Sequence, residues 1–344
     1  QVSPEEHGFD FLARLAETAL DAGRSNDPAL LQALAQLGDI PGTSPDQDAW
    51  RMALLGRALL GAGELEGAAN YFRRAILLES QAAQPLRMAD WFLLLSKADV
   101  SNKSRHVMQA YQALEAVRPL LPRFDLVTQE SIFQLRMLPV FTAAVDIQLD
   151  SSVAAQGSAN IVVAQRIVES FRQAEIQSAF GSDCVPPREP VTLDQLRDGE
   201  ILLYPILLDD RVELIYASKK PGSDIEYRRV TSHDGASREQ IEQLVKDTTY
   251  SLGYGLDDSW ETGSEELYRL LIEPIEAELS EDATLIIIPD GILRRLPFAA
   301  LRDASGSLLI EKASISVAPC RFDGWRNHCE WRVAIVRLVL WSIG

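Results

Sequence analysis

The chain has 344 residues, of which 47% are hydrophobic, a share that fits a packed globular protein and excludes collagen-like, fibrous and wholly disordered classes. At roughly 150 residues per domain, two domains are expected. The 50 acidic residues outnumber the 33 basic ones, and the net charge of −17 would repel phosphate backbones and anionic lipid surfaces. We therefore expect no nucleic acid and no membrane as a partner.

The cysteine pattern indicates a reducing, cytoplasmic environment. Cys184, Cys320 and Cys329 leave one thiol unpaired in any disulfide scheme, and no two of them have the spacing of a zinc or redox motif. The first residues are acidic where a secretory signal is basic and apolar, although a segment removed earlier would leave the same sequence. The apolar run 333–340 is interrupted by Arg337 and is shorter than the ~20 residues of a membrane helix, so no membrane span is expected.

From Phe9 to about Phe180, apolar residues recur every three or four positions, which predicts a helical region over residues 1–180. The clearest helix pair lies between Asp48 and Ser80, with Gly63 at its turn. The predicted contact combines small residues, which allow close approach, with large apolar ones: Gly56, Ala68 and Ala75, and Leu55, Leu59 and Phe72. This pair resembles one tetratricopeptide repeat.

Weaker helix pairs are expected over residues 8–37 and 89–120. Together the three pairs predict a short helical-repeat array, whose concave face would hold a protein or peptide partner. The alternative is an irregular helical bundle, in which the same apolar stripes are only core. The array is the preferred interpretation, and the sequence does not show whether its apolar stripe holds a partner or is only core.

Residues 181–199 form a predicted linker, because glycine and proline are frequent there and no periodicity is present. The composition then changes to β-type runs. Runs at 201–208 and 211–217 around Asp209-Asp210 predict a hairpin, with Pro205 at an edge or bulge because it has no N–H to donate.

The rest of the chain alternates between helical and extended patterns. Helices are expected at 238–251 and 265–279, and the continuous apolar run 284–288 predicts a strand that is buried on both faces. Such a strand points to α/β architecture. Two short strands are expected to form a small meander at 308–311 and 314–317.

Several segments in this half carry a resemblance to a known family. They are Glu266-Leu267-Tyr268, Leu271-Ile272-Glu273-Pro274-Ile275, Leu285-Ile286-Ile287-Ile288-Pro289-Asp290-Gly291, Leu296-Pro297-Phe298-Ala299-Ala300-Leu301, Leu309-Ile310-Glu311 and Ser316-Val317-Ala318-Pro319. In this order they resemble the CHAT family, caspase- and separase-like α/β modules that commonly follow tetratricopeptide repeats. The element order is similar over about residues 150–319. The resemblance implies an α + α/β fold, in which a helical-repeat array precedes an incomplete caspase-like α/β domain at 200–319.

The resemblance also implies a bacterial-type cysteine endopeptidase. In that chemistry a His after one strand takes the proton of a Cys after the next, and the thiolate attacks a peptide carbonyl. Both residues should follow Pro319, within a His-Gly pair and a later Ser-Ala-Cys-like turn, and neither pattern occurs there. We therefore expect this chain to be catalytically inactive.

Residues 320–344 differ in composition from the rest of the chain. They hold Trp325, Trp331 and Trp341 and carry four arginines against two acidic residues. This change predicts a non-native tail produced by a frameshift, a disrupted gene or an assembly error, with a genuine truncation as the alternative.

No residue is assigned a catalytic, cofactor-binding or metal-binding role. His328-Cys329 is the one His/Cys neighbourhood, but adjacent side chains on an extended segment point to opposite faces. Cys184 is distant in sequence from His106 and His233 and is read as a small packing residue. The sequence contains no Walker-type phosphate loop, His-Glu-x-x-His motif or four-ligand metal set, so no cofactor is expected.

Two acidic features have structural explanations. In the turn Pro289-Asp290-Gly291, Asp290 can bond its own backbone and Gly291 can take positive φ, which is preferred to an acid/base or metal role. The resemblance to the CHAT family implies that Leu296, Pro297 and Phe298 pack beneath the catalytic site of that family. The acidic cluster would either attract a basic peptide or, in the preferred reading, form a solvated loop and helix start: Asp257, Asp258, Glu261, Glu265 and Glu266.

Two hypotheses follow. The first is a CHAT-domain protein related to caspase-like cysteine endopeptidases, with repeats that bind a protein, in a copy that lacks the dyad. The second is a non-enzymatic adaptor, in which the helical array binds a partner and the α/β region is only a scaffold.

Overall fold

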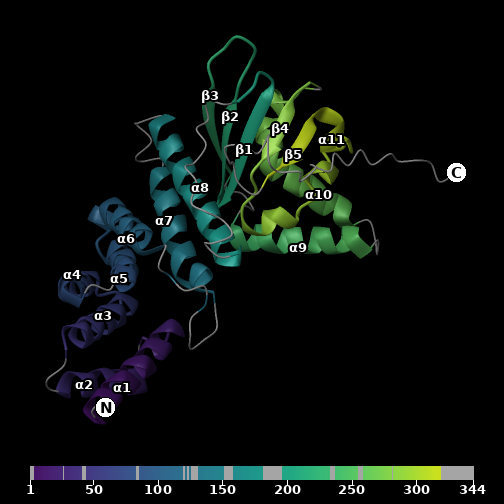
Figure 1. Ribbon diagram of the computed structural model, residues 1–344. Helices are drawn as coiled ribbons and strands as arrows, with labels where there is room; N and C mark the ends of the chain where they lie inside the picture. Colours follow the sequence, from purple (N-terminus) through teal and green to yellow (C-terminus); the bar gives the residue numbers. More distant parts are fainter. Residues whose placement is uncertain are drawn as a thin grey trace. The chain divides into compact units, whose positions relative to one another are not determined.

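The computed structural model (Figure 1) describes residues 4–25, 27–40, 44–82, 85–118, 121, 124, 131–150, 158–180, 196–232, 237–254, 259–280 and 282–318. It divides into two compact units, residues 1–147 and 148–344. The first is helical and the second contains the sheet, which agrees with the α + α/β class.

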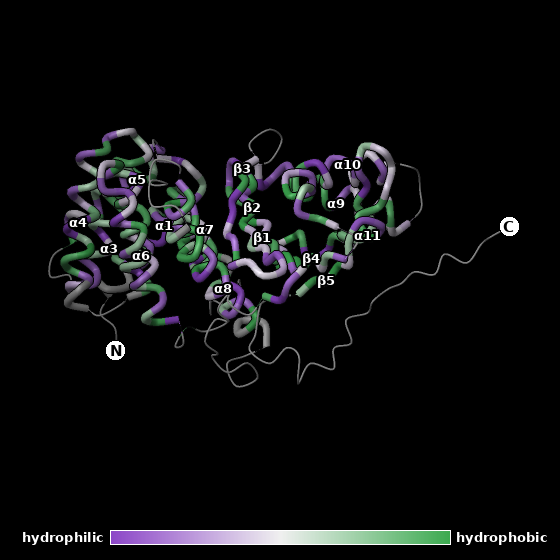
Figure 2. The backbone as a smooth tube through the Cα atoms, turned by 90° about the horizontal axis from the view of Figure 1, so that it is seen from above, coloured by the Kyte–Doolittle hydropathy of each residue, from purple (hydrophilic) through white to green (hydrophobic). Residues whose placement is uncertain are grey.

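Nine helical elements make up the described part of the first unit: α1 (Pro4–Asp21), α2 (Pro28–Asp39), α3 (Pro45–Gly61), α4 (Leu65–Ala82), α5 (Pro85–Ala98), η1 (Val100–Asn102), α6 (Lys103–Val117), η3 (Phe133–Met137) and α7 (Leu138–Gln148). Local signals set their starts. The Asp27 carboxylate accepts a hydrogen bond from Ala29 N at 2.8 Å, directly before Pro28 in the first turn of α2. Green and purple stretches alternate along these helices in Figure 2, as expected for helices with one buried and one solvent-facing side.

The three predicted helix pairs are present as α1/α2, α3/α4 and α5/α6. In the central pair, Phe72 is fully buried against Gly56, and Gly63 takes a φ of +84° at the turn, as predicted. The first helices of successive pairs contact one another, α1 with α3 and α3 with α5, which is typical of stacked repeats. Their identity as tetratricopeptide repeats stays a prediction.

The second unit consists of α8 (Ser158–Phe180), β1 (Glu200–Leu207), β2 (Val212–Ser218), β3 (Glu226–Ser232), α9 (Arg238–Tyr254), α10 (Ser259–Leu271), η6 (Glu273–Glu278), β4 (Thr284–Ile287), η7 (Gly291–Arg295), η8 (Phe298–Ala300), α11 (Leu309–Lys312) and β5 (Ser314–Val317). Its sheet has the order β3-β2-β1-β4-β5. Strands β1, β2 and β3 pair antiparallel, whereas β1, β4 and β5 are parallel.

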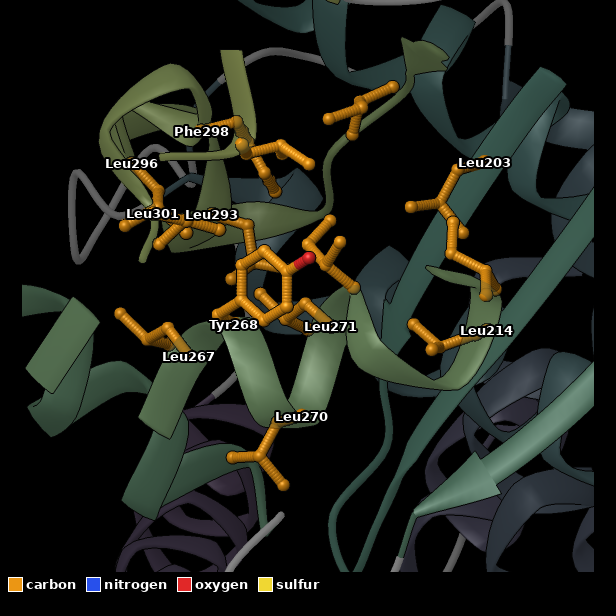
Figure 3. Close-up of a cluster of buried hydrophobic side chains, with 14 of the residues drawn as sticks. Leu203, Leu214, Leu267, Tyr268, Leu270, Leu271, Leu293, Leu296, Phe298 and Leu301 are labelled. Atoms are coloured by element: carbon orange, nitrogen blue, oxygen red, sulfur yellow. The ribbon is translucent and has the colours of Figure 1, made fainter. Parts of the chain in front are cut away.

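The main core lies on one face of this sheet. Alternate residues of the strands, such as Leu203, Leu214 and Leu285, pack with buried residues of α9 and α10. Figure 3 shows Tyr268 and Leu271 of α10 amid this cluster, with Leu293, Leu296 and Phe298 beside them. On the opposite face, Gln165 of α8 donates to the Tyr204 hydroxyl of β1 at 3.2 Å.

The long helix α8 corrects the predicted boundary at residue 180. It belongs to the second compact unit, because its Gln165 and Glu169 side chains bond Tyr204 of the central strand. Most of the predicted linker, residues 181–195, and all of the predicted tail, 320–344, lie outside the described residues.

Three predictions about the strands were wrong. Residues 308–311 do not form a strand: Leu309 begins α11, where the Glu311 carboxylate accepts from Leu308 N at 3.0 Å and closes a helical turn. Strands β4 and β5 form no meander, because they are parallel. Pro205 lies in the central strand β1 and not in an edge strand. It is tolerated there because the β1–β4 ladder ends at Leu203, two residues earlier.

Candidate functional site

The carboxyl end of the sheet is the best-defined polar site of the second unit. Because β1, β4 and β5 are parallel, their carboxyl ends lie at the same edge. The buried strand β4 is followed there by Asp290 and Gly291, the latter with a φ of +45° as predicted. Asp290 itself is 9% exposed.

The Asp290 carboxylate extends the sheet beyond the end of β4. Its Oδ2 accepts from the backbone N–H of Leu207 in β1 at 3.3 Å, and its Oδ1 lies 3.2 Å from Nη2 of Arg172 in α8. Sequence reasoning predicted a bond to the residue's own backbone, but the longer-range partners hold the side chain instead. Asp290 thus joins the strand end, the central strand and the covering helix.

Four charged residues form what we call the sheet-end cluster: Arg172, Glu175, Asp290 and Arg294. Arg294 Nη2 donates to Glu175 Oε1 at 2.6 Å, and Arg172 Nη1 lies 3.6 Å from Glu175 Oε2. Arg172 is 1% exposed, and its Nε and Nη1 have no hydrogen-bond acceptor among the described residues. Two cations and two anions balance, so the cluster has the features of an internal clamp and not of an anion site.

A second charged group lies under the antiparallel strands. Glu213 of β2 is fully buried and accepts hydrogen bonds from Arg211, Arg229 and Thr231, each at 2.7 to 2.8 Å. Both carboxylate oxygens are occupied by donors. Such a saturated carboxylate has a structural function and no free lone pair directed at a ligand.

The first helices of the three pairs carry another charged surface, which we call the first-helix face: Glu17 and Asp21 in α1, Arg57 in α3, Asp90 in α5 and Arg136 in η3. Arg57 pairs with Asp21 at 2.5 Å, and Arg136 pairs with Asp90 at 2.8 Å. Burial raises the pKa of Asp90 to about 6 against the attraction of Arg136, with Glu17 and Arg57 also acting on it. Three successive first helices therefore contribute charges to one surface.

Only part of the cysteines, histidines and acidic residues singled out in the sequence lies within the described residues. All three cysteines, with His233, His328, Asp257 and Asp258, lie outside the described residues. His106 lies in the helical unit, where its Nε2 is 3.1 Å from Asp99 Oδ2 and its Nδ1 is 3.2 Å from Gln109 Oε1. Glu261 pairs with Arg302 and Glu266 with Arg269, so part of the acidic cluster is neutralised.

The packing role expected of the Pro-Phe segment agrees with its position. Leu296 and Phe298 are buried in the main core of the second unit, whereas Pro297 is exposed. Sequence reasoning missed Arg172 and Arg57, because a charged residue in a helix carries no local sign of a distant partner.

The described residues hold no group of three potential metal ligands, and none of their helices combines the length and apolar character needed to cross a bilayer.

Residues 262–325 match the model of the CHAT domain. The matched segment contains most of α10 and then η6, β4, η7, η8, α11 and β5, and so includes Asp290. No curated protein matched the chain.

Proposed function

We propose that this chain combines a protein-binding helical unit with the supporting part of a caspase-like peptidase domain. The CHAT domain is associated with caspase-like peptidases, and the matched residues form the sheet edge where β4 and β5 end. The observation that carries the proposal is Asp290, buried at the carboxyl end of β4 and held by β1 and α8.

Support for the peptidase relationship comes from the geometry of parallel strands. Groups that follow the carboxyl ends of adjacent parallel strands lie close together, which is what a His and a Cys on successive strands require. The clamp around Asp290 would hold that edge rigid. No His-Gly and Ser-Ala-Cys pair follows Pro319 in the printed sequence, so we propose that these 344 residues alone do not hydrolyse peptide bonds.

Support for partner binding comes from the first-helix face. Charged side chains from α1, α3 and α5 share one surface, and complementary charge is a common means of selecting a protein partner. The bound group would be a peptide segment of mixed charge, because the face carries both arginines and carboxylates. The same face would serve the adaptor alternative.

The test uses the full chain in two assays. A peptide array is probed with wild type, with Arg57→Glu on the first-helix face, and with Arg74→Glu, a control on the exposed side of α4. Binding that is lost only in Arg57→Glu supports the proposal, whereas equal binding by all three refutes this face as the binding surface. Fluorogenic peptides are then incubated with wild type and Cys329→Ala. Turnover that depends on Cys329 would refute the inactivity of the chain.

A further inference from the structure

The core stripe of α4 ends in a charged residue. Ala68, Phe72 and Ala75 are all fully buried, and the next position of this stripe, four residues on, is Glu79. Glu79 is fully buried as well. A carboxyl group therefore occupies a position that the helical period assigns to the core.

The buried residues one turn before Glu79 pack in an apolar cluster. Ala75 belongs to a buried cluster with Ala49 and Ala53 of α3 and Trp91 of α5, so this stripe of α4 packs between the two neighbouring helices. Neither Oε1 nor Oε2 of Glu79 has a hydrogen-bond donor among the described residues. A buried carboxylate without donors is costly, and such a group lowers the cost by holding a proton.

Two charged groups face Glu79 from the helices packed against α4. Arg87, near the start of α5, attracts it, and Asp46, in the first turn of α3, repels it. Arg87 makes no hydrogen bond to Glu79, and its own Nη1 is buried without an acceptor among the described residues. Its guanidinium lies 5.3 Å from the centre of the Trp50 ring.

The balance of these effects favours the neutral acid. Burial raises the pKa of Glu79, Arg87 lowers it by attraction, and Asp46 raises it by repulsion. Arg87 is the one cation among the three, and it donates no hydrogen bond to the carboxylate.

We propose that Glu79 is a proton-binding site of the helical unit: the protonated side chain fits the core between α3, α4 and α5, and loss of the proton opens this junction. The junction joins the pair α3/α4 to the pair α5/α6. Proton binding at Glu79 therefore controls whether two successive helix pairs stay stacked. This inference does not depend on the proposed function.

Hydrogen exchange of the full chain tests the proposal. Peptides from residues 65–82 and 85–98 are followed at pH 5 to 8, with rates corrected for intrinsic exchange, in wild type and in Glu79→Gln, which has the shape of the neutral acid. When an acid has a higher pKa in the folded state than in the unfolded state, the folded state becomes less stable as pH rises. The equilibrium constant of opening then increases by up to about ten-fold for each pH unit above the pKa of the unfolded state. We expect equal protection of the two proteins at pH 5 and increasingly faster exchange of wild type above it.

Controls separate this result from general effects of charge. Glu66→Gln, at an exposed position of the same helix, should follow wild type at every pH. Weaker protection of Glu79→Gln at pH 8 would mean that Glu79 is ionised and bridged to Arg87, and would overturn the proposal. An identical pH dependence of wild type and Glu79→Gln would overturn it equally.

A second measurement does not rely on the variant's stability. The side-chain carboxyl carbon of Glu79 is followed by isotope-edited NMR in the wild-type chain, with Glu79→Gln used only for assignment. Titration well above the ordinary glutamate range supports the proposal, and titration within that range refutes it.

Discussion

Replacing Gly56 by alanine should destabilise the helical unit, although alanine is the better helix former. An added Cβ would lie 2.9 Å from Cε1, 3.0 Å from Cδ1 and 3.2 Å from Cζ of Phe72, whereas ordinary contact begins at 3.4 Å. Phe72 is fully buried between helices, so its ring has no free space to move into.

The magnitude follows from two opposing effects. Glycine to alanine in a helix gains about 0.8–1.0 kcal/mol. Overpacking a filled core costs about 1–3 kcal/mol. The net change is a loss of roughly 1 kcal/mol, which corresponds to a fall of about 2–4 °C in the Tm of a unit of this size.

Denaturant unfolding followed by circular dichroism measures this loss. Gly8→Ala is the matched control, because Gly8 lies within α1 and an added Cβ would meet no atom within 4 Å. We expect it to stabilise the unit by about 1 kcal/mol. If Gly56→Ala stabilised the protein as much as Gly8→Ala, close packing of α3 on α4 through Gly56 would be refuted. Phe72→Leu replaces the ring with a smaller side chain, and in the double variant it should reduce the loss of stability that Gly56→Ala causes.

Two further predictions concern charged groups. Because burial raises the pKa of Asp90 from 3.8 to about 6, its contribution to stability is complete below pH 3.8 and is lost as pH rises through 6. Asp90→Asn should remove up to roughly 3 kcal/mol of pH dependence between pH 4 and 7 in urea unfolding, and an unchanged pH profile would contradict this. Arg172→Met should leave Asp290 without its cation, cost roughly 3 kcal/mol in the second unit and speed exchange of the Leu207 amide. Slow exchange at Leu207 in this variant would show that Asp290 needs no clamp.

The element types of the chain were largely predictable from the sequence. Periods of three and four residues identified the helices of the first unit, and the β runs on either side of Asp209-Asp210 predicted the hairpin of β1 and β2. The apolar run 284–288 predicted a strand buried on both faces, and Ile286 on one face and Ile287 on the other are both buried. Each of these signals is local and repeats within one element.

Pairing across the sheet was not predictable, because it depends on elements far apart in the sequence. A short apolar segment such as 308–311 is compatible with either a strand or a helix. The helical turn is favoured here because the Glu311 carboxylate accepts a hydrogen bond from Leu308 N. Strand β5 pairs in parallel with the outer edge of β4 and is the last strand on this side of the described sheet, and its Val317 is 47% exposed.

The sequence by itself determined the helical and β-type halves, the small-residue contact at Gly56 and the resemblance over the segment that includes Asp290. Only the tertiary structure decided what each charged side chain does. Asp290 binds Arg172 and the backbone N–H of Leu207, both more than 80 residues away in the sequence. Hydrogen-bond donors occupy both oxygens of Glu213, whereas Glu79 has no donor among the described residues. The physical reason is that the energy of a buried charge depends on donors and opposite charges nearby in space. A residue's own sequence neighbourhood does not contain that information.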